Sequence, residues 1–329
     1  MCIHINQTQT HLRWSKNIPP IQTISSGETV TFDAIDSSNG QITATSDNTA
    51  LERFDLSLAN PVLGPVYIHD AQPGDVLKVE ILGLEPASWG WSAVIPNFGL
   101  LADEFPQPAL RIWGLNPRTQ SAVFRGTNPN PARDADADTD TGQNRFRIPL
   151  RPFLGCMGVA PPDDRDLSTI PPTHAGGNLD CRDLTVGSIV YFPVMTEGAL
   201  FSCGDGHAAQ GDGEVCGTAI ETPLKATLRF HVCKSQPWVV TPQYESPSVT
   251  GLHVLDGSRR YATTGVASSL EVASKQAVRN LIQWLVDTKG MTRVDAYILA
   301  SVAGDLKITE AVNMPNYVVS MSIPLGIFD

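Results

Sequence analysis

Short segments that favour β-strands fill the first two thirds of this 329-residue chain. They are rich in β-branched and aromatic residues or alternate in polarity, and they span residues 30–36, 40–46, 75–84, 145–150, 187–194 and 226–232. The chain's 27 glycines and 25 prolines are spread out, and the turn sequence QPGD at 72–75 comes just before a predicted strand. The pattern predicts short strands joined by turns and long loops.

The C-terminal third has a helical pattern instead. Residues 268–290 have apolar side chains at the three-to-four spacing of one helix face, namely Leu270, Ala273, Ala277, Leu281, Trp284 and Leu285. Ser268 and Glu271 fit a capping box at its start, and Gly290 fits its end. A second helix is predicted from Thr292. Predicted strands in the first two thirds of the chain and a predicted helical pair in the last third favour an α+β fold that is mainly β.

Composition and charge exclude several classes of protein. Hydrophobic residues make up 42% and charged residues 17%, as in globular proteins, and a net charge of −11 leaves no basic face for nucleic acid or an anionic membrane. The N-terminus lacks the apolar region of a signal peptide, and no apolar run is long enough to span a bilayer. We expect a cytoplasmic protein with one domain over residues 1–329; a division into an N-terminal β lobe (1–150) and a site-bearing lobe (151–329) stays open.

The six cysteines form no CxxC pair, which argues against a structural zinc ribbon; they stand at positions 2, 156, 181, 203, 216 and 233. Without an export signal we expect reduced thiols, each acting as a small buried apolar residue. The acidic, proline-rich stretch 128–144 is predicted to be an exposed or mobile insertion. Its alternating aspartates raise calcium binding as an alternative, but it lacks the glycine and distal glutamate of an EF-hand loop, which favours a solvated loop.

The stretch GDGHAAQGDGE at 204–214 is the most specific candidate site. It holds four glycines, three carboxylates (Asp205, Asp212, Glu214) and His207 in eleven positions. Such ligands suit a divalent metal or acid–base chemistry, while a polar surface loop remains the alternative. In an extended segment Asp212 and Glu214 would share one face; Glu221 cannot be placed by spacing.

Two further clusters carry polar side chains beside turns. Asp36 ends a predicted strand, where it could instead cap the following turn. In THAGGNLDCRDL, His174 and Asp180 flank a double glycine, with Asn178 between them.

Other catalytic classes are weakly indicated. The chain has no GxSxG, GxGxxG-helix or GxxxxGK[ST] motif, so neither a serine elbow nor a nucleotide cofactor is indicated. Cys203 with His207 could form a nucleophile–base pair, although a metal site is favoured over it.

Several segments, in order along nearly the whole chain, resemble one known family. GALFSCGDGHAAQGDGEVCGTAIE (198–221) resembles the signature of the acetamidase/formamidase family, and HAGGNLDCRDL (174–184) is similar to its HxGGNxD-type segment. Residues 64–81 resemble its N-terminal half and residues 281–313 its C-terminal helical part. The chain looks closer to the acetamidase-like branch.

The resemblance implies a hydrolase of small linear amides that releases ammonia and a carboxylate. It also implies a mainly β fold with a sandwich or barrel-like core, a homo-oligomer, and a divalent metal at the active site. The positions that match the family's site region are Asp36, Asn178, Asp180, Asp205, His207, Asp212, Glu214 and Glu221.

Roles follow as hypotheses from the resemblance and from amide chemistry. Asp36, Asp180, Asp205 and His207 are the candidate metal ligands, with zinc favoured and calcium or manganese as alternatives. Glu214 would carry the proton to the departing nitrogen, and Asn178 would donate to the oxyanion. Glu221 is a second general base or a further ligand.

Two N-terminal positions stay outside this assignment. His69 and Asp70 stand where the family pattern suggests a glutamate–glycine pair, which could change substrate preference. His11 also matches a family histidine but is not counted as a ligand. The competing classes are a binding relative that lost the chemistry and an enzyme for a carbamate, a cyclic amide or a larger amide.

Overall fold

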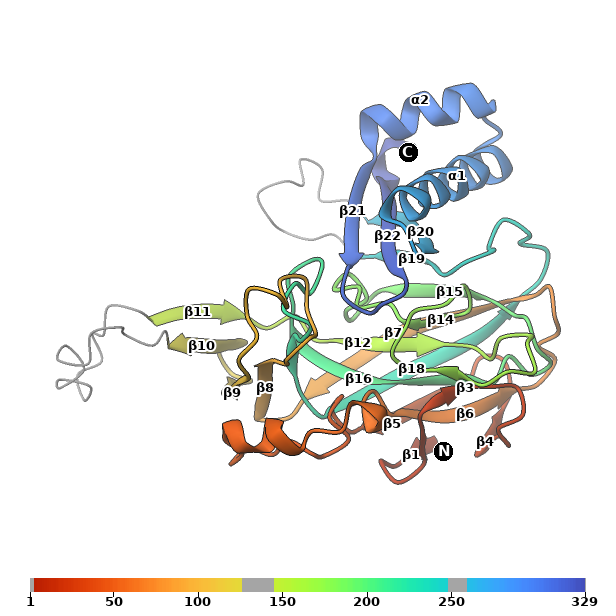
Figure 1. The fold of residues 1–329 in the computed structure, drawn as a ribbon. Coiled ribbons are helices and arrows are strands. Elements are labelled where there is room, and N and C mark those ends of the chain that lie inside the picture. The colour runs from red at the N-terminus through yellow and green to blue at the C-terminus, as the bar shows by residue number, and fades with distance from the viewer. Residues whose placement is uncertain (1–2, 126–144, 248–258, 329) are drawn as a thin grey trace.

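The computed structural model describes residues 3–125, 145–247 and 259–328. The acidic stretch 128–144 and Cys2 therefore lie outside the described residues. Two large sheets make up most of the fold, with a helical pair at one end (Figure 1). This confirms the prediction of a mainly β fold with C-terminal helices.

The first sheet has nine strands within the described residues. Their spatial order is β1 (Ile3–Ile5), β5 (Thr29–Ala34), β18 (Leu224–Cys233), β7 (Val76–Pro86), β15 (Ile189–Pro193), β19 (Gln243–Ser246), β20 (Arg260–Ala267), β22 (Tyr317–Pro324) and β21 (Asp305–Glu310). All neighbours except the parallel pair β1–β5 are antiparallel. Strands from both halves of the chain alternate across the centre of this sheet.

The second sheet carries most of the candidate site. Its main path is β11 (Arg145–Pro149), β10 (Ser121–Arg125), β9 (Ala109–Asn116), β8 (Trp89–Val94), β17 (Ile220–Glu221), β16 (Phe201–Ala209), β12 (Phe153–Gly158) and β14 (Gly176–Asn178). β6 (Val62–Ile68) also pairs with β16, and both β2 (Thr10–His11) and β4 (Gln22–Ile24) pair with β6. Separately, β3 (Arg13–Trp14) pairs with β13 (Leu167–Ser168). Short 3-10 turns complete the fold at Asn48–Arg53, Leu56–Leu58 and Leu325–Phe328.

The main hydrophobic core lies between the two sheets. Phe201 of β16 packs edge-on against Phe230 of β18 at 5.0 Å between ring centroids, and against Phe32 and Phe192 at 6.2 and 6.0 Å. These four rings join the sheets through the apolar faces of their strands. The arrangement is a sandwich, as the family resemblance implied.

The helices α1 (Leu270–Lys289) and α2 (Arg293–Ala303) form a second core with β20 and β22 (Figure 1). Tyr261 of β20 stacks on Trp284 of α1 at 4.0 Å. Gly290 ends α1 in the left-handed conformation, and Thr292 caps α2, both as predicted. Neither helix in the described part of the chain combines the length and apolar character of a membrane span.

Two local predictions were wrong. Residues 40–46 form turns, because the Thr43 amide binds the Ser46 hydroxyl and the Ile42 amide binds the Ser38 hydroxyl in place of a strand ladder. The capping box also fails to form: the N-cap of α1 is Ser269, which makes no side-chain cap, and Glu271 pairs with Lys275 one turn later.

Candidate active site

The glycine-rich stretch begins as a buried strand. All nine residues of β16 are buried, including Asp205 and His207. These two side chains lie on one face because they alternate along the strand. Gly206 points to the other face, where a Cβ would come closer than 3.0 Å to Leu224 of the opposite sheet. The glycine therefore lets β16 lie against the core while its polar residues face the site, which excludes the surface-loop alternative for this strand.

Strand pairing and the following turn bring two glutamates to His207. β17 pairs with β16 so that Glu221 stands opposite His207, and its Oε2 lies 3.1 Å from His207 Nε2. Glu214 is buried with its Oε1 3.9 Å from the same nitrogen. The expectation that Asp212 shares a face with Glu214 was wrong, because positive φ at Gly213 (93°) and Glu214 (47°) turns the chain. Asp212 is exposed and pairs with Lys307 at 3.3 Å.

Asp180 reaches the site from the end of β14. Its Oδ2 accepts a hydrogen bond from Asn313, and it lies beside Asp205 across Gly155 of β12. A Cβ at Gly155 would come closer than 3.0 Å to both carboxylates. The missing side chain therefore leaves room for two acidic groups at one point.

Three of the site carboxylates stand on strained backbone. Asp180, Asp205 and Glu214 have φ of 42°, 59° and 47°. Non-glycine residues in this region cost about 1–3 kcal/mol each and concentrate at functional sites, where the surroundings hold them. The strain indicates that the positions of these side chains are imposed by the fold.

The hydrogen bonds of Gln210 fix the protonation of the His207 ring. The Gln210 amide nitrogen donates to the Asp180 main-chain carbonyl at 2.8 Å, so its oxygen faces the ring. That oxygen lies 2.8 Å from His207 Nδ1 and can only accept, so Nδ1 carries a proton. Nε2 then faces the oxygens of Asp205, at 3.2 Å, and Glu221. A lone pair there would face carboxylates, so Nε2 needs a proton or a metal ion.

Charge in the site is unbalanced. Burial raises the pKa of Asp180, Asp205 and Glu214, and neighbouring carboxylates raise each pKa further. Burial would also raise the pKa of Glu221, but His207 and hydrogen bonds from Ser37 and the Ala219 amide hold that pKa below its usual value. Burial lowers the pKa of His207. The Glu221 and Asp205 carboxylates raise this pKa more strongly, so that it lies well above its usual value. No lysine or arginine is among the described residues that line the pocket.

These residues fit a divalent cation. Within the described residues, two groups of potential ligands have all their donor atoms within 4.8 Å of one another: Asp180, Asp205 and His207, and His207, Glu214 and Glu221. Asp180 Oδ1 is buried and has no hydrogen-bond partner among the described residues, as expected of an oxygen that binds a ligand or ion. Oxygen donors with one imidazole suit zinc, manganese or calcium.

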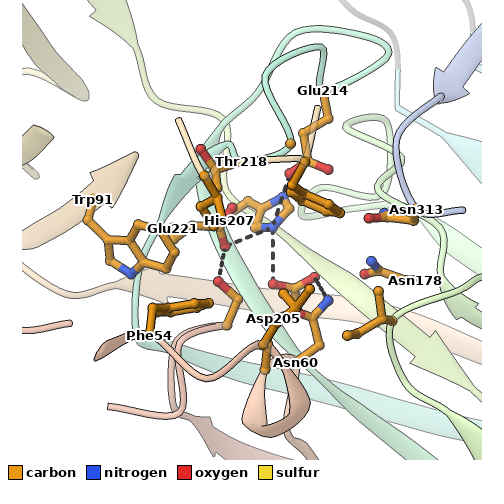
Figure 2. A pocket seen from close by; sticks show the side chains of 17 residues that line it. Phe54, Asn60, Trp91, Asn178, Asp205, His207, Glu214, Thr218, Glu221 and Asn313 are labelled. Carbon is orange, nitrogen blue, oxygen red and sulfur yellow. Dashed lines mark hydrogen bonds and ion pairs between the residues drawn. The ribbon is translucent and has the colours of Figure 1, made fainter. Parts of the chain in front are cut away.

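A small pocket opens onto this cluster (Figure 2). Its volume is about 40 Å³. Asn60, Asn178, Asp205, His207, Glu214, Thr218, Glu221 and Asn313 supply polar lining, and Phe54, Leu56, Trp91, Ile95, Phe98 and Ile170 supply apolar walls. Figure 2 shows Asn178 and Asn313 on one side of the carboxylate–histidine cluster and Trp91 and Phe54 on the other.

Asp36 lies outside both ligand groups. Its Oδ1 accepts hydrogen bonds from the Ser38 amide at 2.9 Å, the Ser38 hydroxyl and Trp91 Nε1 at 3.0 Å. Burial raises its pKa. The structure therefore gives Asp36 the turn-capping arrangement that the sequence left open.

The remaining candidates also lie apart from the pocket. Cys203 is packed in the core between the sheets, where burial raises its thiol pKa. His11 bonds to Ser202 and the Arg13 carbonyl, and burial lowers its pKa to about 4. His69 and Asp70 are exposed, as is His174.

Sequence reasoning missed four residues that support the site. Ser37 donates to Glu221 at 2.8 Å, Asn60 donates to Asp205 at 3.4 Å, Gln210 orients His207, and Asn313 donates to Asp180. Gln210 stood inside the glycine-rich stretch and Ser37 beside Asp36, so adjacency was an available signal for both. Asn60 and Asn313 come from distant segments and had no local signal.

The fold and the site define a β-sandwich protein with a buried carboxylate–histidine centre suited to a divalent cation. The chain belongs to the Acetamidase/Formamidase family, whose sequence model matches residues 3–168 and 163–329. This confirms the resemblance found in the sequence.

Relatives named formamidase and acetamidase match this chain over most of their length. A formamidase of Methylophilus methylotrophus is 26% identical, covering 98% of this chain and 90% of that protein, and an acetamidase of Mycolicibacterium smegmatis is 27% identical, covering 88% and 84%. The solved structure of an acetamidase from Bacillus halodurans superposes with a TM-score of 0.85 at 29% identity, over 99% of this chain and 98% of that one.

Proposed function

We propose that this protein hydrolyses small linear amides to ammonia and a carboxylate, with a divalent cation bound at the carboxylate–histidine cluster. One observation carries the proposal: His207 Nε2 faces two carboxylates, while Nδ1 of the same ring is already protonated. Membership of the Acetamidase/Formamidase family supports the reaction class. A bound cation would lower the pKa of water toward about 7 and polarise the amide carbonyl.

The candidate cation ligands are His207, Asp205 and Asp180, and Glu221 also faces His207 Nε2. Glu221 is a further candidate ligand. Against the effect of burial, His207 and the hydrogen bonds from Ser37 and the Ala219 amide lower its pKa, which keeps it ionised. Zinc is the first metal to test, and manganese and calcium suit the same donors.

Glu214 is the proposed proton carrier. It enters from the turn after β16, and burial raises its pKa above the usual carboxyl value. A carboxyl group with a raised pKa can take a proton from water near neutral pH and return it to the departing nitrogen. Asn178 is proposed to donate to the carbonyl oxygen as negative charge develops there.

Pocket size supports a small substrate. About 40 Å³ is room for about three water-sized spheres. Aromatic and isoleucine walls then limit the acyl group to one or two carbons, as in formamide and acetamide. We also propose a cytoplasmic homo-oligomer. The five cysteines in the described part of the chain, all unpaired, support the location, and the exposed apolar side chains Leu100, Leu101 and Phe105 support the oligomer.

His207→Ala tests the assignment. We expect loss of bound metal and of ammonia release from formamide and acetamide, since the variant removes the only nitrogen ligand of both groups. His174→Ala is the matched control, because His174 is exposed, and it should retain both. Activity that survives in His207→Ala with metal still bound would contradict the assignment.

A further inference from the structure

One buried cysteine lies directly behind the proposed oxyanion donor. Cys156 of β12 stands opposite Asn178 of β14 in an antiparallel pair, so both side chains lie on the same face. Its sulfur is 2.9 Å from Asn178 Oδ1. Both residues are buried, but only Asn178 lines the pocket. This contact goes beyond the apolar role expected for the cysteines.

The thiol has a choice of acceptors, and its distances favour Asn178. The Thr169 carbonyl and Asp205 Oδ2 lie at 3.8 and 3.7 Å from the sulfur, both farther than Asn178 Oδ1. A cysteine side chain is ordinarily S–H near neutral pH, and oxygen acceptors surround the Cys156 sulfur. A thiol offers one weak donor, and here that donor meets the amide oxygen.

This contact determines which end of the amide faces the substrate. An asparagine side chain has an acceptor end and a donor end that exchange by rotation. With the oxygen held by Cys156, the NH₂ group is left for the pocket. Asp205 Oδ2 and the Thr169 carbonyl oxygen lie within 3.8 Å of the sulfur. Without the thiol, both of these acceptors would attract the NH₂ end.

We propose that Cys156 is a positioning residue that holds Asn178 with its NH₂ group toward the substrate carbonyl. The inference rests on the proposed amide hydrolysis, in which that NH₂ group donates to the developing oxyanion. Cys156 itself does not touch the reacting atoms.

Kinetics of three variants test the proposal. Cys156→Ala should lower kcat on acetamide by about tenfold or more, with KM changed less than about threefold, because the lost interaction matters most in the transition state. Cys156→Ser keeps a donor and should stay within about threefold of the native kcat. Cys203→Ala removes the same volume from the neighbouring strand, where no hydrogen bond of the thiol is found among the described residues, and should leave kcat unchanged.

A second readout does not depend on turnover. In protein labelled with ¹⁵N-asparagine, the side-chain signals of Asn178, assigned by their absence in Asn178→Ala, should move in Cys156→Ala but not in Cys203→Ala. Equal loss of kcat in Cys156→Ala and Cys156→Ser, or unmoved Asn178 signals in Cys156→Ala, would overturn the proposal. A native enzyme inactive on every amide, with Asn178 signals that still move, would refute the proposed function and leave the positioning role standing.

Discussion

At the scale of single residues, the site depends on what His207 Nε2 binds. One ring nitrogen donates to Gln210, and the other faces Asp205 and Glu221. The orienting bond comes from a residue three positions along the same chain segment. It therefore affects the site without contributing a ligand.

Gln210→Leu should weaken metal binding by about 10–100-fold, the range for loss of a partner that orients a metal-bound histidine. The variant removes the acceptor for Nδ1–H while leaving every proposed ligand in place. Competitive titration against a chelator of known affinity measures the change. Gln283→Leu, on the outer part of α1, is the control and should bind as the native protein does. Equal affinities for all three proteins would contradict the role of Gln210.

Metal affinity should rise with pH. Burial raises the pKa of Asp180 and Glu214, and the Glu221 and Asp205 carboxylates raise that of His207 against its burial. These groups hold protons to higher pH than free side chains, and protons must leave before a cation binds. Each proton released should strengthen binding by about tenfold per pH unit. Titrations across pH 6–8 check the slope, and affinity independent of pH would refute this coupling.

At the scale of elements, β16 shows how a strand can combine burial with polar function. Gly206 allows close approach to Leu224, while its neighbours Asp205 and His207 face the pocket. Gly206→Ala should lower the free energy of unfolding by about 1–3 kcal/mol, because the added methyl group overpacks a filled core.

Denaturant unfolding of two matched variants measures this effect. Gly114→Ala makes the same change in β9, where a Cβ would meet nothing within 4 Å. It should change stability by less than about 0.5 kcal/mol. Equal stabilities of the two variants would show that β16 is not packed as described.

The sequence predicted the positions of strands and helices better than it predicted which of them pack together at the site. Alternating patterns located β5, β7, β15 and β18, because such patterns reflect local burial. The strand predicted at residues 40–46 does not form, because serine side chains there accept hydrogen bonds from nearby backbone amides. Glu221 could not be placed because its position opposite His207 depends on strand register. Asn313 enters the site only through the packing of the C-terminal strands on the turn that carries Glu214.

At the scale of the molecule, the site depends on the packing of the two sheets and on the C-terminal strand β21. The Gly213 amide donates to the Thr309 carbonyl at the end of β21, and Lys307 pairs with Asp183 and Asp212. The edge strand β21 of the first sheet therefore holds the turn that presents Glu214. Membership of one family over the whole chain agrees with this mutual dependence.

Phe201→Ala should destabilise the whole fold by about 3–5 kcal/mol, the range for removing a buried phenylalanine. Phe201 contacts three aromatic rings of the opposite sheet. Thermal and denaturant unfolding give the loss. Tyr297→Ala is the control, because that ring is 61% exposed, and it should have little effect. A loss below about 1 kcal/mol in Phe201→Ala would show that the rings do not join the sheets.

An assay of ammonia release tests most directly whether this protein is a metal-dependent amide hydrolase. Formamide, acetamide and propionamide are assayed with the protein as purified, after chelation, and after return of zinc, manganese or calcium separately. We predict turnover that is lost on chelation and restored by one of these metals. Turnover that persists in protein shown to be free of metal would contradict the claim.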